Sequence, residues 1–471
     1  MKVEQIYTGC LAHGAYYIVS NGEAAIVDPL REVNPYLDRL KADNAKLKFI
    51  LETHFHADFV SGHVDLKNKT GAEIIYGPGA KADFECTSAY DGQILELGNV
   101  KIKVLHTPGH TMESSCFLLI DENGKEHSLY SGDTLFIGDV GRPDLAQKAA
   151  GKTQEELAAL LYHSIRDKVM TLNDDVIVYP GHGAGSACGK NMSKETVSTI
   201  GHEKKHNYAL RANMTEQEFV EEVTAGLLPP PGYFGMNVAM NKQGYESIDS
   251  VLNHATKAMT AEEFEAAAEG GALILDTRNA SDFAKGFIPQ SINIGLNGDF
   301  APWVGALIVD VKTPLILVTY PGREEEAAVR LSRIGFDNQH GYLLGGFESW
   351  ISAGKESDEI KRMSAEEFEN KVNLVKDMIV DIRKESEYSA QHIEDAYNKP
   401  LAYINHWIKD INPEEHFYMH CAGGYRSMIA ASILMARGYR NFTEVEGGFE
   451  AISKSDIPTT DYICQSKVMR V

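Results

Sequence analysis

Residues 53–58 read Thr53-His54-Phe55-His56-Ala57-Asp58, and this run of imidazole and carboxylate side chains decides how the N-terminal half is interpreted. Three later segments carry the same kinds of side chain: Thr107-Pro108-Gly109-His110, Ser131-Gly132-Asp133 and Tyr179-Pro180-Gly181-His182. Each of the three contains glycine, which lets the backbone turn sharply, and loops at strand ends can bring distant ligands together. Imidazole and carboxylate groups suit divalent metals such as Fe(II), Zn(II) and Mn(II). We therefore predict a metal site built from these four segments.

Short β-type runs alternate with helical patterns through the first ~245 residues. The runs with the clearest strand character are 16–19, 25–27, 48–51, 101–105 and 176–179. The His- and Asp-bearing segments lie in loops between such runs, so the chemistry is expected at strand ends.

The ligand pattern resembles the metallo-β-lactamase superfamily, whose His-x-His-x-Asp-His motif is followed by a later His, a bridging Asp and a final His. The resemblance covers about residues 1–245 and implies an N-terminal αββα sandwich. Phe59 stands where the binuclear hydrolases of that superfamily place a second-site His. A second metal would keep only Asp58, His182 and a shared Asp133, so we expect one metal rather than two.

Three further segments look like the persulfide dioxygenase branch of the superfamily: Gly141-Arg142-Pro143-Asp144, Leu161-Tyr162-His163-Ser164 and Thr196-Val197-Ser198-Thr199. In that branch a single Fe(II) is held by two His and one Asp, which the resemblance places at His54, His110 and Asp133. Two His and one carboxylate leave a face open, on which a substrate sulfur and O2 can bind side by side. His56, Asp58 and His182 would then orient the ligands, with His56 left open as a fourth ligand.

Arg142 matches an Arg that contacts the thiol substrate in the family, and a guanidinium could hold a carboxylate or phosphate. A surface ion pair is the alternative role. Members that use glutathione persulfide carry a Tyr two residues after the final His, where this chain has Ala184. The Gly-rich loop 183–190, with Ser186 and Lys190, is a candidate cradle for another anionic carrier such as a phosphate-bearing thiol. Glutathione, coenzyme A and other thiols stay open as the carrier.

Length and composition limit the classes of protein. The chain has 471 residues, and domains usually run to about 100–200 residues, so we expect three. A net charge of -22 argues against general binding to nucleic acid or to a membrane surface. Six cysteines without a CxxC pair do not form a disulfide framework. With no apolar signal or membrane-spanning run, a cytoplasmic protein is expected.

The second half contains an internal repeat. Leu275-Asp276-Thr277-Arg278 aligns with Val380-Asp381-Ile382-Arg383, and Gly345-Gly346-Phe347-Glu348 aligns with Gly447-Gly448-Phe449-Glu450. Both pairs are ~100 residues apart, the size of a domain rather than of a solenoid repeat. Residues 227–235, with three prolines and two glycines, are expected to interrupt regular structure, and residues 354–362 either link the copies or form a solvated helix face. We predict domains at 1–245, 246–357 and 358–471.

The last copy contains a nucleophilic loop, His420-Cys421-Ala422-Gly423-Gly424-Tyr425-Arg426-Ser427. It lies between the apolar run 417–419 and a helical pattern at 428–435, so Cys421 is expected at a strand-loop-helix junction. Backbone N–H groups at the start of that helix would stabilise a thiolate, and Arg426 would add positive charge. A buried, inert cysteine is the alternative.

Residues 364–460 resemble the rhodanese family, with matching residues at Asp381, Arg383, Glu387, Tyr388, His392, Ile393, Asn398, Pro400 and Gly447-Gly448-Phe449. The resemblance implies a parallel α/β sheet, Cys421 and Arg426 as catalytic residues, and Gly423, Gly424, Tyr425 and Ser427 as substrate-binding residues. The spacing Cys-x4-Arg is shorter than the Cys-x5-Arg of related phosphatases, which favours a sulfur over a phosphate. The first copy reads Val318-Thr-Tyr-Pro-Gly-Arg-Glu-Glu-Glu326 at the equivalent place. It lacks cysteine, so we expect a structural or docking domain.

The whole chain resembles a persulfide dioxygenase joined to a degenerate and then an active rhodanese domain. The resemblance implies Fe(II)- and O2-dependent oxidation of a low-molecular-weight persulfide to sulfite, in sulfide detoxification. Sulfur transfer at Cys421 would give thiosulfate, or the reverse reaction would regenerate a persulfide. The alternatives are a zinc thioester hydrolase of the glyoxalase II type and a non-catalytic sulfur relay or sensor. A homo-oligomer is expected, without a defined symmetry.

Overall fold

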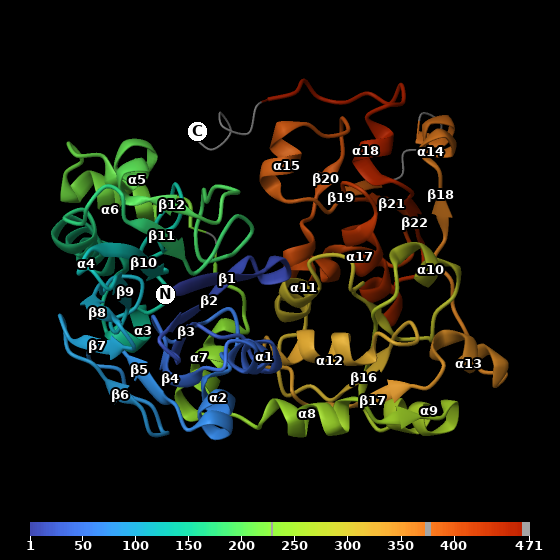
Figure 1. Ribbon diagram of the computed structural model, residues 1–471. Helices are drawn as coiled ribbons and strands as arrows, with labels where there is room; N and C mark the ends of the chain where they lie inside the picture. The colour runs from blue at the N-terminus through green and yellow to red at the C-terminus, as the bar shows by residue number, and fades with distance from the viewer. Residues whose placement is uncertain (228, 373–377, 464–471) are drawn as a thin grey trace. The chain divides into compact units, whose positions relative to one another are not determined.

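The computed structural model describes residues 1–227, 229–372 and 378–463 (Figure 1). They form two compact units: Met1–Ser250 with Ser332–Gly335, and the remaining described residues. The predicted α/β architecture is confirmed, with two mixed sheets in the first unit and two parallel sheets in the second. Leu228 and Cys464 lie outside the described residues. In the part of the chain described, no helix is long and apolar enough to span a bilayer.

The first unit contains two six-stranded sheets, ordered β1-β2-β3-β4-β5-β6 and β12-β11-β10-β9-β8-β7. The strands of the first sheet are β1 (Lys2–Thr8), β2 (His13–Ser20), β3 (Glu23–Val27), β4 (Lys46–Leu51), β5 (Glu73–Tyr76) and β6 (Thr87–Ser88). Those of the second are β7 (Ile94–Leu97), β8 (Val100–His106), β9 (Ser115–Ile120), β10 (Glu126–Gly132), β11 (Ile177–Pro180) and β12 (Ser198–Thr199). All five predicted strand runs coincide with β2, β3, β4, β8 and β11.

Alternate residues of these strands face different cores. Tyr16 and Ile18 of β2 join the core between the two sheets, where they meet Phe117 and Leu119 of β9. Tyr17, their neighbour, faces the opposite way, toward α1 and α2. The period-2 alternation of a strand therefore gives each sheet one face toward the other sheet and one face covered by helices.

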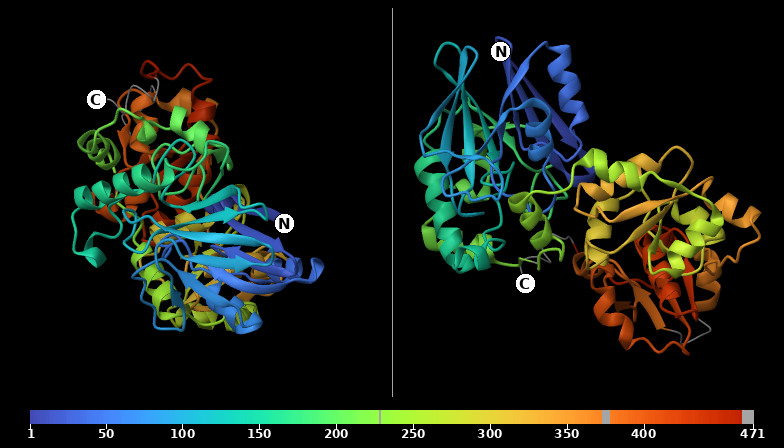
Figure 2. Two further views of the ribbon diagram at one scale, coloured as in Figure 1. Left: turned by 60° about the vertical axis from the view of Figure 1, so that its left-hand side comes forward. Right: turned by 90° about the horizontal axis from the view of Figure 1, so that it is seen from below.

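Helices cover the outer faces of both sheets and complete an αββα sandwich, and α1 is seen beside the first sheet in the right-hand view of Figure 2. The helices of this unit are α1 (Asn34–Ala42), α2 (His63–Thr70), α3 (Gln147–Ala150), α4 (Gln154–Ser164), α5 (Ile200–His206), α6 (Glu216–Thr224) and α7 (Phe234–Gln243). The next helix, α8 (Ile248–Ala255), begins in the first unit and ends in the second. Thr153 begins α4 with a capping box that includes Glu156, and Thr215 does the same for α6 with Glu218.

The second unit contains two five-stranded parallel sheets with the same strand order, β13-β17-β16-β14-β15 and β18-β22-β21-β19-β20. The first sheet comprises β13 (Ala258–Met259), β14 (Leu273–Asp276), β15 (Ile292–Asn293), β16 (Leu315–Val318) and β17 (Gln339–Leu343). The second comprises β18 (Arg362–Met363), β19 (Met378–Asp381), β20 (Tyr397–Asn398), β21 (Phe417–His420) and β22 (Phe442–Val445). Their helices are α9 (Ala261–Glu269), α10 (Ala280–Lys285), α11 (Phe300–Leu307), α12 (Glu324–Ser332), α13 (Gly346–Ser352), α14 (Ala365–Val372), α15 (Glu385–Ala390), α16 (Ile404–Trp407), α17 (Tyr425–Ala436) and α18 (Gly448–Ile452).

The two landmarks of the sequence repeat meet in space within each copy. Arg278 pairs with Asp276 at 2.6 Å, and its guanidinium lies 4.3 Å from the ring centroid of Phe347. In the second copy, Arg383 pairs with Asp381 at 2.6 Å and lies 3.9 Å from the Phe449 ring. The Asp-x-Arg and Gly-Gly-Phe motifs thus contact each other in both copies, which explains why both recur at one spacing.

Two predicted breaks have different outcomes. Residues 354–362 contain no helix and join the two sheets of the second unit as an irregular segment ending in β18, as the linker interpretation predicted. In the Pro-rich stretch 227–235, regular structure resumes earlier than predicted, because α7 begins at Phe234. Tyr233 and Phe234 are both buried, and their packing overrides the local breaker signal.

Candidate functional site

Three predicted metal ligands converge at strand ends in the first unit. His54 follows β4, His110 follows β8 and Asp133 follows β10. The Nε2 atoms of His54 and His110 lie 3.8 Å and 3.5 Å from Asp133 Oδ2. The ligand atoms of all three residues lie within 4.8 Å of one another, and all three side chains are buried. Neither oxygen of Asp133 has a hydrogen-bond partner among the described residues, so this donor set fits a divalent metal.

Each of the two histidines is held through its outer ring nitrogen. His110 Nδ1 donates to the carbonyl oxygen of Arg142 at 2.8 Å. His54 Nδ1 lies 3.0 Å from Thr53 Oγ1, which donates in turn to Asp28 Oδ2 at 2.8 Å. These contacts fix the tautomer and leave Nε2 of both rings facing the centre.

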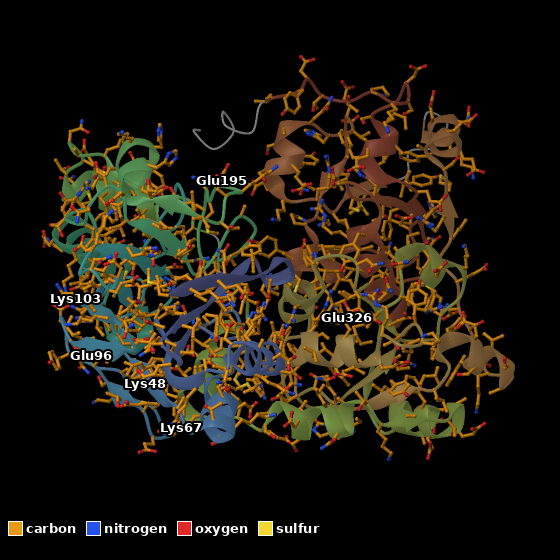
Figure 3. All side chains as sticks on the ribbon, viewed as in Figure 1. Lys48, Lys67, Glu96, Lys103, Glu195 and Glu326 are labelled. Atoms are coloured by element: carbon orange, nitrogen blue, oxygen red, sulfur yellow. The ribbon has the colours of Figure 1, made fainter. Side chains whose placement is uncertain are left out.

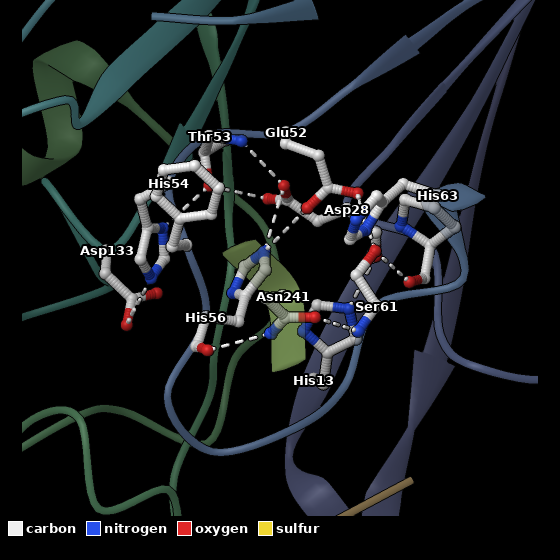
Figure 4. A network of polar contacts seen from close by, with 12 residues as sticks. His13, Asp28, Glu52, Thr53, His54, His56, Ser61, His63, Asp133 and Asn241 are labelled. Atoms are coloured by element: carbon white, nitrogen blue, oxygen red, sulfur yellow. Dashed lines mark hydrogen bonds and ion pairs between the residues drawn. The ribbon is translucent and has the colours of Figure 1, made fainter. Parts of the chain in front are cut away.

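His56 is oriented by buried carboxylates (Figure 4). Its Nε2 lies 3.1 Å from Asp28 Oδ1 and 3.6 Å from Glu52 Oε2, while Asn241 donates to its backbone oxygen. Burial opposes ionisation of Asp28, yet the His56 ring beside it keeps the pKa of that carboxyl below its usual value. Burial raises the pKa of Glu52, and Asp28 raises it further. His56 is therefore tied to this carboxylate network, and its role as a fourth ligand stays a prediction.

His182 and Asp58 form a second buried donor group beside the first. His182 Nε2 lies 3.3 Å from Asp58 Oδ2 and 3.7 Å from Asp133 Oδ1. Burial opposes protonation of His182, but these two carboxylates outweigh it and raise its pKa. Cys188, also buried, contributes a sulfur within 4.8 Å of ligand atoms of Asp133 and His182. Burial raises the pKa of the Cys188 thiol to about 12.

Glycines in the ligand motifs allow this close approach. Gly132 has φ +50, and a Cβ there would lie 2.5 Å from Thr53 Oγ1. A Cβ on Gly181 would lie 2.7 Å from Asp133 Oδ1. A side chain at either position would displace a ligand or the residue that orients it.

Arg142 lies in the site, but its guanidinium is already engaged. It binds Asp144 through two hydrogen bonds of 2.7 and 2.8 Å, and its Nη1 donates to the carbonyl of Ala187. The side chain is 6% exposed, so the surface ion pair considered from sequence does not describe it. Its contact with a substrate stays a prediction.

The Gly-rich loop after His182 is also held internally. Lys190 Nζ donates to the carbonyls of Glu222 and Ala225, and Ser186 Oγ accepts from the backbone of Cys188. The ammonium group of Lys190 therefore points to the end of α6 and to the residue that follows this helix. The role of the loop as a cradle for an anionic carrier stays a prediction.

Cys421 directly follows β21 and precedes α17, as the strand-loop-helix pattern predicted. Its Sγ accepts a hydrogen bond from the Gly424 backbone at 3.1 Å and lies 3.4 Å from Ser427 Oγ. The side chain is 1% exposed. Gly424 has φ +103, which turns its N–H toward the sulfur at the start of α17. This loop can stabilise negative charge on sulfur.

Arg426 does not stand as an isolated cation beside Cys421. Its two terminal nitrogens bind Glu387 at 2.6 and 2.8 Å, and this contact raises the pKa of the guanidinium. Burial opposes ionisation of Glu387, but Arg426 lowers its pKa. The positive charge of Arg426 beside the loop is therefore paired with the negative charge of Glu387.

Tyr425 connects the cysteine loop to the cysteine-free copy within the second unit. Its hydroxyl donates to the carbonyl of Gly295 at 2.8 Å. Its ring packs on Gly298, where a Cβ would lie 2.4 Å from the ring carbon that bears the hydroxyl. Tyr425 was predicted to bind substrate, and the structure gives it this supporting contact.

The equivalent loop of the first copy is occupied by acidic residues at the start of α12, where Glu326 is labelled in Figure 3. Glu326 pairs with Arg323 at 2.7 Å and with Arg330 at 2.6 Å. These acidic side chains offset the partial positive charge at the N-terminus of α12. In the second copy, the N-terminus of the equivalent helix, α17, faces Cys421.

Sequence reasoning missed Asp28, Thr53 and Cys188 as parts of the metal site. Asp28 follows strand β3 as the predicted ligands follow theirs, so its position was a usable signal. Cys188 lies in a Gly-rich loop, and the sequence of this loop does not indicate which way the Cys188 side chain points.

Comparisons with known proteins agree with these geometries. The Metallo-beta-lactamase superfamily matches residues 8–182, and the Rhodanese-like domain matches residues 260–353 and 364–455. A probable hydroxyacylglutathione hydrolase of Schizosaccharomyces pombe is 33% identical over 201 residues, 41% of this chain and 73% of that protein. The mitochondrial persulfide dioxygenase of Homo sapiens is 30% identical over 224 residues, 46% of this chain and 78% of that protein.

A solved structure extends the comparison beyond one domain. The crystal structure of a metallo-β-lactamase from Staphylococcus aureus subsp. aureus COL superposes with a TM-score of 0.63 at 29% identity, covering 73% of this chain and 98% of that chain. The named relatives include both hydroxyacylglutathione hydrolases and persulfide dioxygenases. The chain therefore belongs to the metallo-β-lactamase superfamily, and its metallo-β-lactamase domain is followed by two rhodanese-like domains.

Proposed function

We propose that the chain is a persulfide dioxygenase with sulfurtransferase activity. One Fe(II) would be held by His54, His110 and Asp133 and would activate O2 for insertion into the terminal sulfur of a persulfide. The overall reaction is RSSH + O2 + H2O → RSH + SO3²⁻ + 2H⁺, in which sulfur is oxidised and O2 is reduced. The observation that carries the proposal is the buried pair of histidine Nε2 atoms converging on Asp133 Oδ2.

The residues around the ligands have defined tasks in this scheme. Arg142 orients His110 through its backbone carbonyl, and Asp28 orients His54 through Thr53. Burial of the whole set excludes bulk water from a reactive site. The substrate is a low-molecular-weight thiol persulfide, and the kinship to a protein named persulfide dioxygenase supports that choice.

Sulfur transfer is assigned to Cys421. Its persulfide would give its outer sulfur to sulfite, Cys–SS⁻ + SO3²⁻ → Cys–S⁻ + S2O3²⁻, and the reverse direction would regenerate a persulfide. The Gly424 N–H, 3.1 Å from Sγ, stabilises the thiolate that leaves. Ser427 Oγ lies 3.4 Å from the sulfur and donates to Glu444 at 2.6 Å, which keeps its hydroxyl in place.

Oxygen uptake tests the first activity. Iron-loaded protein is given glutathione persulfide or coenzyme A persulfide, and sulfite and thiosulfate are quantified. We expect persulfide-dependent uptake that is lost in His110→Ala and kept in the control His202→Ala, whose side chain is exposed on α5. The preferred persulfide identifies the carrier. No uptake by iron-loaded wild type refutes the proposal.

A second pair of variants separates the two activities. Cys421→Ser is expected to lose thiosulfate formation and to accumulate sulfite at an unchanged rate of oxygen uptake. Cys86→Ser, which changes a partly exposed thiol elsewhere, is expected to keep both. Equal loss of both activities in Cys421→Ser contradicts the two-site assignment.

A zinc thioester hydrolase is the competing function, and the 33% identity to a probable hydroxyacylglutathione hydrolase favours it. Phe59 counts against the binuclear form of that site, because its ring lies 4.3 Å from the His56 and His13 rings where it offers no ligand. Hydrolysis of a glutathione thioester by zinc-loaded protein, without oxygen uptake by the iron-loaded form, would favour the hydrolase. If the protein shows neither activity, a non-catalytic sulfur relay becomes the favoured function.

A further inference from the structure

The loop that carries the first metal-site motif is held in place by residues outside it. Residues 52–62, between β4 and α2, have irregular backbone and are called the ligand loop below. Asn241 of α7 holds this loop, because its side-chain nitrogen donates to the carbonyl of His56 and its side-chain oxygen accepts from the backbone of Ser61, both at 2.9 Å (Figure 4). The loop carries three candidate metal-site residues, His54, His56 and Asp58.

A second support for the ligand loop comes from a segment much later in the chain. The segment Ser332–Gly335 begins at the last residue of α12 and belongs to the first compact unit. In this segment, the carbonyl oxygen of Arg333 accepts the N–H of Val60 at 2.7 Å. Val60 is fully buried and follows Asp58 by two residues. This hydrogen bond therefore fixes the ligand loop close to Asp58.

Side-chain contacts keep the carbonyl of Arg333 where it is. The guanidinium of Arg333 binds Glu32 through Nε, at 3.0 Å, and through Nη2. Nη1 of Arg31, whose side chain is fully buried, donates to the carbonyl of the preceding residue, Ser332, at 3.2 Å. Hydrogen bonds that involve a charged group are stronger than neutral ones. The backbone at 332–333 is thus anchored to the chain that follows β3.

The guanidinium of Arg333 also contacts the segment that supports the loop after His182. Its Nη1 lies 3.2 Å from Cys10 Sγ. Two residues after Cys10, the carbonyl of Ala12 accepts the N–H of Gly183 at 2.8 Å, and Gly183 directly follows His182. Arg333 therefore holds the ligand loop through its backbone and contacts the support of the His182 loop through its side chain.

We propose that Arg333 is a positioning residue of the metal centre, which acts through Val60 and Cys10 rather than by touching a ligand. Ser332 ends a helix of the cysteine-free copy, so the chain of that copy supplies part of the support of the metal site. The expected effect on catalysis rests on the proposed dioxygenase activity. The expected effect on the bound metal holds for a zinc hydrolase as well.

Co(II) is the probe of the metal site, because its visible d–d bands respond to the geometry of its ligands. In the full chain, Arg333→Ala should change these bands and weaken Co(II) binding by about 10- to 100-fold. Arg333→Lys keeps a cation opposite Glu32 and should recover part of the affinity. Arg39→Ala is the matched control, because Arg39 of α1 makes an ion pair of the same kind with Glu4 in the same unit, at 2.6 Å. Its bands and affinity should equal those of the wild type.

Kinetics separate positioning from a general loss of stability. In iron-loaded Arg333→Ala, kcat for oxygen uptake should fall by about 10- to 100-fold at an unchanged KM for persulfide, and sulfur transfer at Cys421 should stay the same. A lower urea midpoint with wild-type Co(II) bands and kcat would overturn the proposal. If Arg333→Ala does not fold, Glu32→Gln, which removes the charge that holds the guanidinium, is measured in the same way.

Failure of the proposed function can be told apart from failure of this inference. Absence of oxygen uptake in the iron-loaded wild type would refute the dioxygenase. The Co(II) bands would still test Arg333, and identical bands in wild type, Arg333→Ala and Glu32→Gln would show that Arg333 has no part in positioning the metal centre.

Discussion

Gly298→Ala is the sharpest test of how the cysteine-free domain supports the Cys421 loop. The new Cβ would lie 2.4, 2.6 and 2.8 Å from three carbons of the Tyr425 ring. Carbon atoms in contact normally stay about 3.5–4.0 Å apart, so the ring must move by roughly 1 Å. Tyr425 directly follows Gly423 and Gly424 of the loop and lies four residues after Cys421, so the loop moves with it.

The substitution should destabilise the native arrangement of the Tyr425 ring in two ways. Overpacking costs about 1–3 kcal/mol, and loss of the Tyr425–Gly295 hydrogen bond adds about 0.5–1.5 kcal/mol. A displacement of ~1 Å at a reacting group lowers the rate by about 100-fold. We therefore expect sulfur transfer from thiosulfate to fall by about 10- to 100-fold in kcat/KM, at an unchanged rate of oxygen uptake.

The control and the refutation use the same assay. Gly270→Ala, in the same domain, brings its Cβ no closer than 3.3 Å to any atom and should keep full activity. In a Tyr425→Ser background the clash is absent, so Gly298→Ala should cause no further loss. Full sulfur transfer in Gly298→Ala, or an equal loss in both backgrounds, would refute the supporting role of this contact.

Three other predictions concern the metallo-β-lactamase domain. Asp28→Asn removes a negative charge that orients His54 through Thr53 and contacts His56. The affinity for iron, measured by equilibrium dialysis, should therefore fall by about 10- to 100-fold. An unchanged affinity would contradict this role of Asp28. Gly181→Ala places a Cβ 2.7 Å from Asp133 Oδ1 and should lower the bound metal per chain, whereas Gly232→Ala, with open space around it, should not. Burial lowers the pKa of His63 to about 3 from 6.5, so the unfolded state takes up a proton that the folded state refuses as pH falls below 6.5. The free energy of unfolding should then drop by up to about 1.4 kcal/mol per pH unit down to about pH 4. In urea titrations His63→Phe should show a shallower drop, and equal slopes would exclude His63 as a source.

The elements that the sequence predicted are those in which local pattern and tertiary environment agree. Strands β2, β3 and β4 are apolar runs ended by polar residues, and their burial matches their pattern. The positions of His54 and His110 could be predicted because each histidine follows a strand end, His54 in a run of histidine and aspartate and His110 directly after Gly109. The Cys421 loop could be predicted because an apolar strand, glycines and a helical pattern follow in order.

The features that could not be predicted depend on pairs distant in sequence. Glu387 and Arg426 are 39 residues apart, and nothing near either residue indicates their ion pair. Asp28 has φ +48, and an aspartate in that conformation looks like an ordinary turn residue until its partners are known. Cys188 is placed by the loop around it, which follows no periodic pattern.

The contact between Tyr425 and the Gly295–Gly298 turn defines the smallest portion of this chain that could be moved into another protein to test the proposed sulfur transfer. A segment starting at residue 358 would carry Cys421 but would leave the Tyr425 ring without its glycine surface and its hydroxyl without its carbonyl. The transferable cassette is therefore both parallel sheets together, from Val251 onward. The cysteine-free domain must therefore accompany the Cys421 domain in any such transfer.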